Sequence, residues 1–231
     1  MQLDLLSGGA AQGLVGTLAA RFKAETGADI AGTFTAIGAV RDTLLAGAPA
    51  DLVVLSKGMI ADLSRAGHVE GPGVDIGVVR TAVAQRTGDP APAIATPDEL
   101  RASFLAADAI YIPDPKLATA GIHVAGILDT LGIRQAVAAK LRAFPNGMTA
   151  MREMAAQTGG RPIGCTQATE VLHTPGITLV GPLPKAFELA TTYTAAVATR
   201  ARNPDQARRL LMLLTEVAGA GARAAAGFEP A

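Results

Sequence analysis

The sequence predicts an α/β fold, because short apolar runs alternate with helical patterns along its first quarter. Three runs of strand length, Leu3–Leu6, Ile30–Thr35 and Asp51–Ser56, are each followed by a helical pattern, the first two through turns of small residues. In the first helical pattern, over 14–22, apolar residues recur at i, i+3 and i+4 spacing. The β-branched pair Val53–Val54 is typical of a buried parallel strand. We therefore expect doubly wound sheets.

Each of the first three helices is expected to begin soon after a strand. The first follows the turn Ser7–Ala10 and ends at Gly27, the second covers 38–46, and the third covers 59–66 and ends at Gly67. The first N–H groups of a helix have no partner within the helix, and they attract anions. An anion site is therefore expected where these strand ends and helix starts meet.

The alternation continues through the middle of the chain. Thr96 to Glu99 predicts a helix start, since Thr caps the helix, Pro occupies its first position and Glu completes a capping box. The other expected elements are strands at 78–86, 109–112 and 162–165, helices at 119–131, 134–144 and 147–157, and a helical turn or two at 166–172.

The end of the chain predicts a return to the first lobe. Strands are expected at 177–182 and 191–198, and Asn203-Pro204 begins a long final helix. We expect two lobes joined by two crossing strands, with 1–80 and 179–231 in the first lobe and 81–178 inserted as the second. Ligands of such folds bind at strand ends and helix starts, in a cleft.

Composition excludes several functions. Acidic and basic residues number 20 each, so the chain lacks the basic surface expected of a nucleic-acid-binding protein. No apolar stretch approaches the roughly 20 residues that span a bilayer, so we expect no membrane insertion. Three scattered histidines and one cysteine show no metal-ligand spacing. The segment GGAAQG lacks the glycine spacing and the Lys-Ser/Thr of nucleotide-binding loops, so no cofactor is expected.

Four segments, TFTAIGAV, GAPADLVVLS, IYIPDPKLATAG and PIGCTQAT, carry a resemblance that covers nearly the whole chain. In these motifs and their order, the chain resembles the bacterial periplasmic molybdate-binding proteins, a branch of the type 2 solute-binding superfamily. The resemblance implies a type 2 periplasmic-binding-protein fold with two hinge strands, closure of the lobes on a ligand, and an ABC transporter permease as partner if the protein is exported. MQLDLLSGGA has no signal-peptide pattern, so we expect a cytoplasmic protein if Met1 is the natural start, and a periplasmic one if a leader was removed.

The departures from this family fall on its ligand-binding turns. Family members hold a tetrahedral oxyanion with serine hydroxyls in the first two turns and a tyrosine near the second hinge. Here Ala10, Ala36 and Ile37 replace the serines, and Cys165 lies close to the tyrosine position. A hydrogen bond to a charged group contributes about 1.5–3 kcal/mol, so losing several should weaken molybdate binding by orders of magnitude. We therefore expect a different anion, and a carboxylate larger than molybdate is favoured if Arg41 lines the site.

The expected ligand-binding residues are uncharged donors at strand ends or helix starts. Single Ser and Thr residues act most often as helix caps, but their convergence at family positions favours a ligand site. The candidate side chains are Ser7, Thr35, Ser56, Thr119, Thr166 and Gln167, and the candidate backbone positions are Gly9, Ala10, Ala36, Ile37, Ala120 and Gly121.

Three further side chains each have two interpretations. Arg41 either grips a carboxylate or lies on a solvated helix face paired with Asp42. His123 either contacts the ligand or covers a helix start, and Cys165 is either a small buried hydrophobe or a reactive thiol at a helix N-terminus.

These three side chains bear on the alternative to a binding protein, an isomerase on the same scaffold such as an aconitate isomerase. Arg41 would then clamp a carboxylate, and His123 or Cys165 would carry the proton in an allylic transfer. An anion sensor that binds and closes without turnover is a third possibility.

Overall fold

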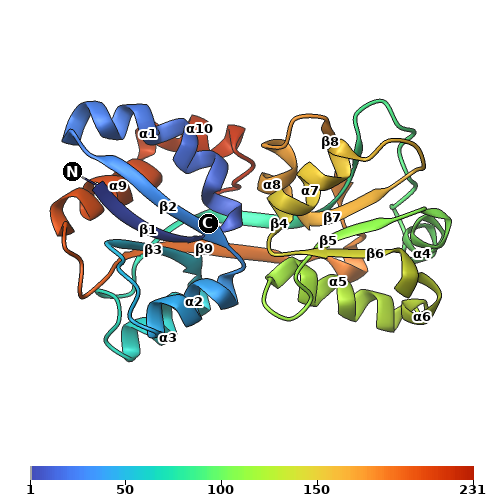
Figure 1. The fold of residues 1–231 in the computed structure, drawn as a ribbon, viewed down its shortest axis with the longest axis horizontal. Coiled ribbons are helices and arrows are strands. Elements are labelled where there is room, and N and C mark those ends of the chain that lie inside the picture. Colours follow the sequence, from blue (N-terminus) through green and yellow to red (C-terminus); the bar gives the residue numbers. More distant parts are fainter. Residues whose placement is uncertain (1) are drawn as a thin grey trace. The chain divides into compact units, whose positions relative to one another are not determined.

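The computed structural model describes residues 2–231, which divide into two compact units. Unit 1 contains the residues up to Val79 together with Thr191–Ala231, and unit 2 is Arg80–Ala190. The chain passes between them along strand β4 (Val74–Arg86) and at the start of β9 (Ala190–Val197) (Figure 1). No helix in this described range is long and apolar enough to cross a membrane.

The chain returns from unit 2 to unit 1 at 190/191, and not at 178/179 as the sequence predicts. Strand β8 (Ile177–Pro182) pairs antiparallel with the part of β4 that runs from Ala82 to Arg86, and it therefore belongs to unit 2. The sequence pattern showed a strand here but not its partner. Only β9 returns to unit 1, where it pairs antiparallel with β3.

Unit 1 has a sheet in the order β2-β1-β3-β9, whose first three strands are parallel. They are β2 (Asp29–Thr35), β1 (Gln2–Gly8) and β3 (Leu52–Ser56). Gly8 is opposite Thr35 in the β1–β2 register, so these two strands end at the same level. The expected doubly wound arrangement is confirmed.

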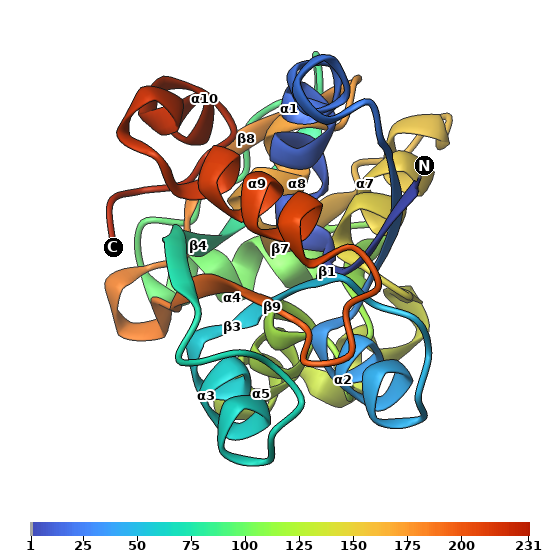
Figure 2. The ribbon, with the colours of Figure 1, turned by 90° about the vertical axis from the view of Figure 1, so that its left-hand side faces the viewer.

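Helices cover both faces of the unit 1 sheet (Figures 1 and 2). A short 3-10 segment (Gly9–Ala11) leads from β1 into the first of them. One face carries α1 (Gln12–Thr26), α9 (Pro204–Thr215) and α10 (Ala220–Ala225), and the other carries α2 (Ile37–Leu45) and α3 (Lys57–Arg65). A second 3-10 segment (Val217–Gly219) precedes α10.

A buried carboxylate joins the amino end of β3 to the start of α9. Asp51 is 1% exposed and accepts hydrogen bonds from the N–H groups of Arg202 (2.7 Å) and Asn203 (2.8 Å) through Oδ1. Its Oδ2 accepts from the Asp4 N–H at 2.9 Å. Burial acts to raise the pKa of Asp51, but the hydrogen bonds from Asp4, Asn203 and Arg202 outweigh it and hold the pKa below its ordinary value.

Unit 2 has a mixed sheet in the order β4-β7-β5-β6, with β8 also paired to β4. Strand β7 (Ile163–Gln167) is antiparallel to β4 and parallel to β5 (Ile110–Pro113). The edge strand β6 (Leu141–Phe144) lies where the sequence predicted the second half of a helix. That expectation was wrong, because the helix ends early and Leu141–Phe144 forms a parallel ladder with β5.

The helices of unit 2 lie on both faces of its sheet (Figure 1). One face carries α4 (Pro97–Ala106), α5 (Thr119–Thr130) and α6 (Arg134–Val137), and the other carries α7 (Gly147–Ala156) and α8 (Ala168–Leu172). The predicted capping box at Thr96 and Glu99 is confirmed. The 3-10 segments of this unit are Ala138–Lys140 and Lys185–Phe187.

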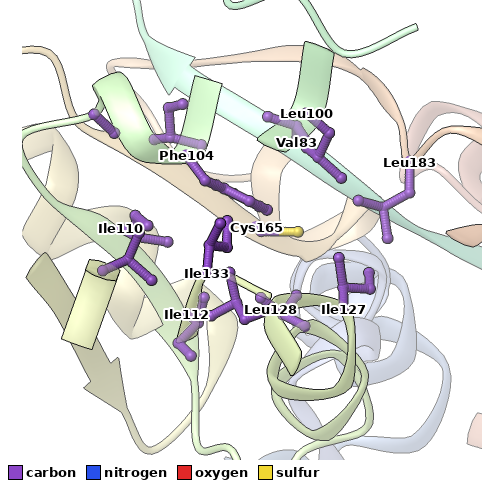
Figure 3. Close-up of a cluster of buried hydrophobic side chains, with 14 residues drawn as sticks. Val83, Leu100, Phe104, Ile110, Ile112, Ile127, Leu128, Ile133, Cys165 and Leu183 are labelled. Carbon is purple, nitrogen blue, oxygen red and sulfur yellow. The ribbon is translucent and has the colours of Figure 1, made fainter. Parts of the chain in front are cut away.

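Apolar clusters hold the two layers of unit 2 together. On the α4–α5 face, Figure 3 shows Val83, Phe104, Leu128 and Cys165 converging on one another, and all four are fully buried. Burial of this kind contributes about 25 cal/mol per Å² of apolar surface, which makes these clusters the main source of stability in the unit. The opposite face is packed by Met151 and its neighbours from α7.

Candidate functional site

Three helices of unit 1 begin at one edge of its sheet. The parallel strands β1, β2 and β3 end at Gly8, Thr35 and Ser56, and the helical segments that follow begin at Gly9, Ile37 and Lys57. Carboxyl ends of adjacent parallel strands share an edge, which is where open α/β sheets bind ligands. The structure therefore brings the unit 1 candidates of the sequence analysis, apart from Arg41, to one edge.

The helix N-termini at this edge carry no side-chain caps. The N-cap residues of α1, α2 and α3 make no side-chain capping hydrogen bond within the part of the chain that the structure describes. They are Ala11, Ala36 and Ser56. The first N–H groups of α2 and α3 are thus left to solvent or to a ligand. The positive ends of the helix dipoles coincide with these donors, so the edge favours an anion.

Apolar side chains surround these backbone donors. Ala10, Ala36 and Ile37 are buried, and a Cβ atom on Gly8 would lie 2.7 Å from Ile37 Cγ2. Ser7 is fully buried, and its hydroxyl donates to the Gly8 carbonyl at 2.9 Å. The edge therefore offers mainly backbone N–H groups, with Thr35 and Ser56 half-buried beside them.

Arg41 points to its own neighbour. Its Nε and Nη2 donate to Asp42 Oδ1 at 2.9 and 2.7 Å, and both side chains are exposed. This geometry corresponds to the solvated-face interpretation of Arg41.

In unit 2, the first turn of α5 lies against the chain that follows β5. Thr119, Ala120 and Gly121 form this turn, and the N-cap residue Ala118 makes no side-chain capping hydrogen bond within residues 2–231. A Cβ atom on Gly121 would lie 2.2 Å from the Asp114 carbonyl oxygen and 2.4 Å from that of Pro113. The glycine is required for this close approach.

His123 lies one turn further along α5 and is half-buried. Its Nε2 is 2.7 Å from the Phe187 carbonyl oxygen. A carbonyl can only accept, so Nε2 carries a hydrogen, and in the neutral ring Nδ1 keeps a lone pair.

Cys165 is a core residue. It has no exposed surface and packs among Val83, Phe104 and Leu128 (Figure 3). Burial raises the pKa of its thiol to about 12, so the thiolate is scarce near neutral pH. The structure therefore favours the interpretation of Cys165 as a small buried hydrophobe.

Gln167, the last residue of β7, faces Thr81 across the antiparallel ladder with β4. Both are buried, at 3% and 1% exposed, and neither the Gln167 amide atoms nor Thr81 Oγ1 has a hydrogen-bond partner among residues 2–231. Each unpaired buried polar group costs about 1–3 kcal/mol. Sequence reasoning identified Gln167 but missed Thr81, whose role depends on a register that a strand pattern does not reveal.

Thr166 makes a hydrogen bond to a buried carboxylate that the sequence analysis did not identify. Its hydroxyl donates to Glu170 Oε2 at 2.5 Å, and the Gly147 N–H donates to Oε1 at 3.1 Å. Burial raises the pKa of Glu170 above its ordinary value, although the hydrogen bonds oppose this. The i, i+4 spacing of Thr166 and Glu170 was the one sequence signal of this pair.

No candidate metal site accompanies these groups. Among residues 2–231, no three His, Cys, Asp or Glu side chains are arranged to hold a metal ion.

Two α/β units connected by two chain crossings, with helix N-termini at the carboxyl ends of parallel strands, are the architecture of the periplasmic-binding-protein fold. The chain belongs to the family described as bacterial extracellular solute-binding protein, whose model matches residues 3–229. The expected type 2 periplasmic-binding-protein fold is confirmed by this match and by the structural neighbours.

The chain is similar to one relative in sequence and to two solved structures in fold. The chain is 28% identical to the aconitate isomerase of a Pseudomonas species, over 99% of this chain and 87% of that protein. Its fold matches the periplasmic molybdate-binding protein of Azotobacter vinelandii with a TM-score of 0.79 at 14% identity, covering 99% of both chains. It matches the sulfate-binding protein SubI of Mycobacterium tuberculosis with a TM-score of 0.75 at 20% identity, covering 100% of this chain and 87% of that one.

Proposed function

We propose that this protein is a solute-binding protein for a small carboxylate anion. The observation that carries the proposal is the group of helix N-termini in unit 1, where no side-chain cap is made by Ala11, Ala36 or Ser56 within residues 2–231. Backbone N–H groups and helix dipoles hold an anion without a counter-cation. If the protein is exported, its partner is an ABC transporter permease.

Two features favour a carboxylate over a tetrahedral oxyanion. Ala10, Ala36 and Ile37 present methyl groups where hydroxyl donors would be needed to hold molybdate or sulfate. The relative named aconitate isomerase takes its name from a tricarboxylate and is similar along 99% of this chain. The expected ligand therefore carries two or three carboxylate groups.

Gln167 and Thr81 are the proposed neutral ligand contacts of unit 2. An amide offers two donors and an acceptor, and a hydroxyl offers one donor, so the pair can bind a carboxylate or a hydroxyl group. Their lack of hydrogen-bond partners among residues 2–231 supports this role, because a ligand would supply the bonds that the folded chain does not.

Calorimetry with molybdate, sulfate and a panel of di- and tricarboxylates tests the proposal. We expect one carboxylate to bind at least 100-fold more tightly than either oxyanion, a difference of about 2.7 kcal/mol. Submicromolar molybdate affinity would contradict the proposed ligand class. No detectable binding of any anion in the panel would contradict the binding function.

Gln167→Met provides a sharper test of the contact in unit 2. If Gln167 serves the ligand, Met should weaken carboxylate binding at least tenfold. It should also stabilise the ligand-free protein, by up to about 1–3 kcal/mol, since it removes an unpaired buried amide. Gln135→Met, at an exposed position of α6, is the matched control and should change neither quantity. A large loss of stability in Gln167→Met would show a structural role instead.

A second candidate function is isomerisation of a carboxylate on the same scaffold. It is favoured by the aconitate isomerase relative and by His123, whose Nε2 is held by the Phe187 carbonyl while Nδ1 can accept a proton. The base would remove a proton from the allylic methylene carbon, the double bond would move by one position, and a proton would be added at the former vinylic carbon. Protons and electrons balance without a cofactor.

An absorbance assay for trans- to cis-aconitate conversion tests this second candidate. Turnover in the wild type that falls at least 100-fold in His123→Gln would support it. His173→Gln is the matched control, because the His173 ring also contacts a backbone carbonyl, that of Thr169, through its other nitrogen, Nδ1. Absence of turnover in the wild type would contradict the isomerase function and would not affect the proposed binding function.

A further inference from the structure

The N-terminus of α7 in unit 2 already holds a carboxylate that belongs to the protein. Glu170 is 4% exposed, and its two oxygens accept from the Gly147 N–H and the Thr166 hydroxyl. The N–H groups of Met148 and Gln167 also hydrogen-bond to this carboxyl group. Four donors therefore converge on one carboxylate, which offers about four lone-pair sites.

The first turn of α7 has its N–H groups satisfied within the protein. Gly147 and Met148 donate to Glu170. Thr149 donates to Asn146 Oδ1 at 2.8 Å, and Ala150 donates to the Asn146 carbonyl at 3.1 Å. Glu170 thus takes the place at α7 that an anionic ligand takes at a free helix N-terminus.

The absence of a side chain at Gly147 makes room for this arrangement. A Cβ atom there would lie 1.8 Å from Thr166 Oγ1 and 2.0 Å from Glu170 Oε2. Real Cβ atoms do not approach other atoms this closely. Gly147, Thr166 and Glu170 therefore depend on one another, and we refer to these three residues as the Glu170 cluster.

We propose that Glu170 is an intramolecular ligand that fills the anion-binding N-terminus of α7 and so excludes small oxyanions from this part of unit 2. It engages the donors that a sulfate or molybdate ion would need, so these donors are not available to a second anion. As a determinant of specificity it rests on the proposed function, in which the solute is a larger carboxylate that binds elsewhere in the site.

Glu170→Ala should convert this position into a site for free anions. The variant removes the carboxylate and leaves the Gly147, Met148 and Gln167 N–H groups and the Thr166 hydroxyl without their acceptor. Thermal unfolding is followed with formate, sulfate or molybdate, at ionic strength matched with chloride. At an anion concentration of about 100 times Kd, we expect the midpoint of Glu170→Ala to rise by about 5–10 °C more than that of the wild type.

Two controls separate this effect from general salt stabilisation. Glu153→Ala removes an exposed glutamate of the same helix and should respond to each anion as the wild type does. Glu170→Gln keeps the shape, but its amide N–H₂ cannot accept hydrogen bonds, and it leaves no space for an anion. An equal anion response in Glu170→Ala and Glu153→Ala would overturn the proposal.

The wild type gives a second test that does not depend on the folding of a variant. Amide proton resonances of Gly147 and Met148 should shift together in an NMR pH titration, with one apparent pKa above that of an exposed glutamate. No shift of either amide would contradict the proposal. Neither test uses the carboxylate solute, so a failed carboxylate panel would disprove the proposed function alone, and an absent anion response would disprove the role of Glu170 alone.

Discussion

Each unit of the protein uses one buried carboxylate to hold a helix N-terminus, but at opposite ends of its strands. In unit 1, Asp51 precedes β3 and binds the start of α9, at the amino end of a strand. In unit 2, Glu170 follows β7 and binds the start of α7, at the carboxyl end of a strand. Unit 1 thus leaves its proposed ligand edge to backbone donors, and unit 2 places a carboxyl group of its own at the corresponding strand end.

The pKa directions of the two groups differ although both are nearly unexposed. Burial works against ionisation in both cases, but at Asp51 the hydrogen bonds win and the pKa is lowered, whereas at Glu170 burial wins and the pKa is raised. The fold therefore stabilises the ionised form of Asp51 and disfavours the ionised form of Glu170. Glu170 adjoins Thr166, one of the proposed ligand residues, and a group with a perturbed pKa at such a position is a candidate for a functional role.

The largest expected effect is the loss of Asp51. Asp51→Ala leaves the N–H groups of Asp4, Arg202 and Asn203 without their acceptor, and we expect it to lower the free energy of unfolding by about 3–5 kcal/mol. Urea unfolding measures this change. Asp62→Ala, which removes an exposed carboxylate paired with Arg65, should change it by less than about 0.5 kcal/mol. Equal changes in the free energy of unfolding for the two variants would contradict the expected difference between a buried carboxylate and an exposed one.

The next effect tests the packing of the Glu170 cluster. Gly147→Ala should destabilise the protein by about 2–3 kcal/mol, because the added methyl group meets Thr166 and Glu170. In the double variant with Glu170→Ala, the part of the penalty that comes from Glu170 should be relieved and the part that comes from Thr166 should remain, which a double-mutant cycle measures. Gly126→Ala, in an exposed part of α5 with space around it, should instead stabilise by about 0.5–1 kcal/mol. Additive effects at positions 147 and 170 would contradict the contact.

The pH dependence of stability should have opposite signs at the two carboxylates. The pKa of Asp51 is lowered in the folded state, so its contribution is present above the unfolded pKa and is lost as pH falls through the folded pKa. The pKa of Glu170 is raised, so the folded state binds the proton more tightly and stability falls as pH rises from the unfolded toward the folded value. Unfolding of Asp51→Asn and Glu170→Gln from pH 3 to 8 should remove the respective slopes. Slopes of the same sign would refute the comparison.

The smallest effect is expected at the exposed pair of Arg41 and Asp42. Asp42→Asn should change the free energy of unfolding by less than about 0.5 kcal/mol, since exposed ion pairs contribute little. Arg41→Ala should be equally mild and should leave the carboxylate affinity unchanged. A tenfold loss of affinity in Arg41→Ala would show instead that this arginine contacts the ligand.

The fold could be predicted further than the site because each depends on a different range of interactions. Strand and helix periodicity is local, so the three strand–helix units of the first quarter were found from the sequence. The strand Leu141–Phe144 was missed because its conformation is set by pairing with β5, which a local pattern does not contain. Thr81 and Glu170 were missed for the same reason. The first depends on the register with Gln167, and the second on a helix start that arrives from an earlier part of the chain.

The missing methyl group at Gly147 also restricts the order in which this part of the protein can change. A lineage that first shortens the side chain at position 170 removes one of the two clashes that a larger residue at position 147 would make, and the other, with the Thr166 hydroxyl, must be relieved as well. The reverse order passes through an intermediate in which a Cβ atom collides with two buried oxygens. The route toward a different anion specificity in unit 2 therefore begins with Glu170, and the helix start can diversify only afterwards.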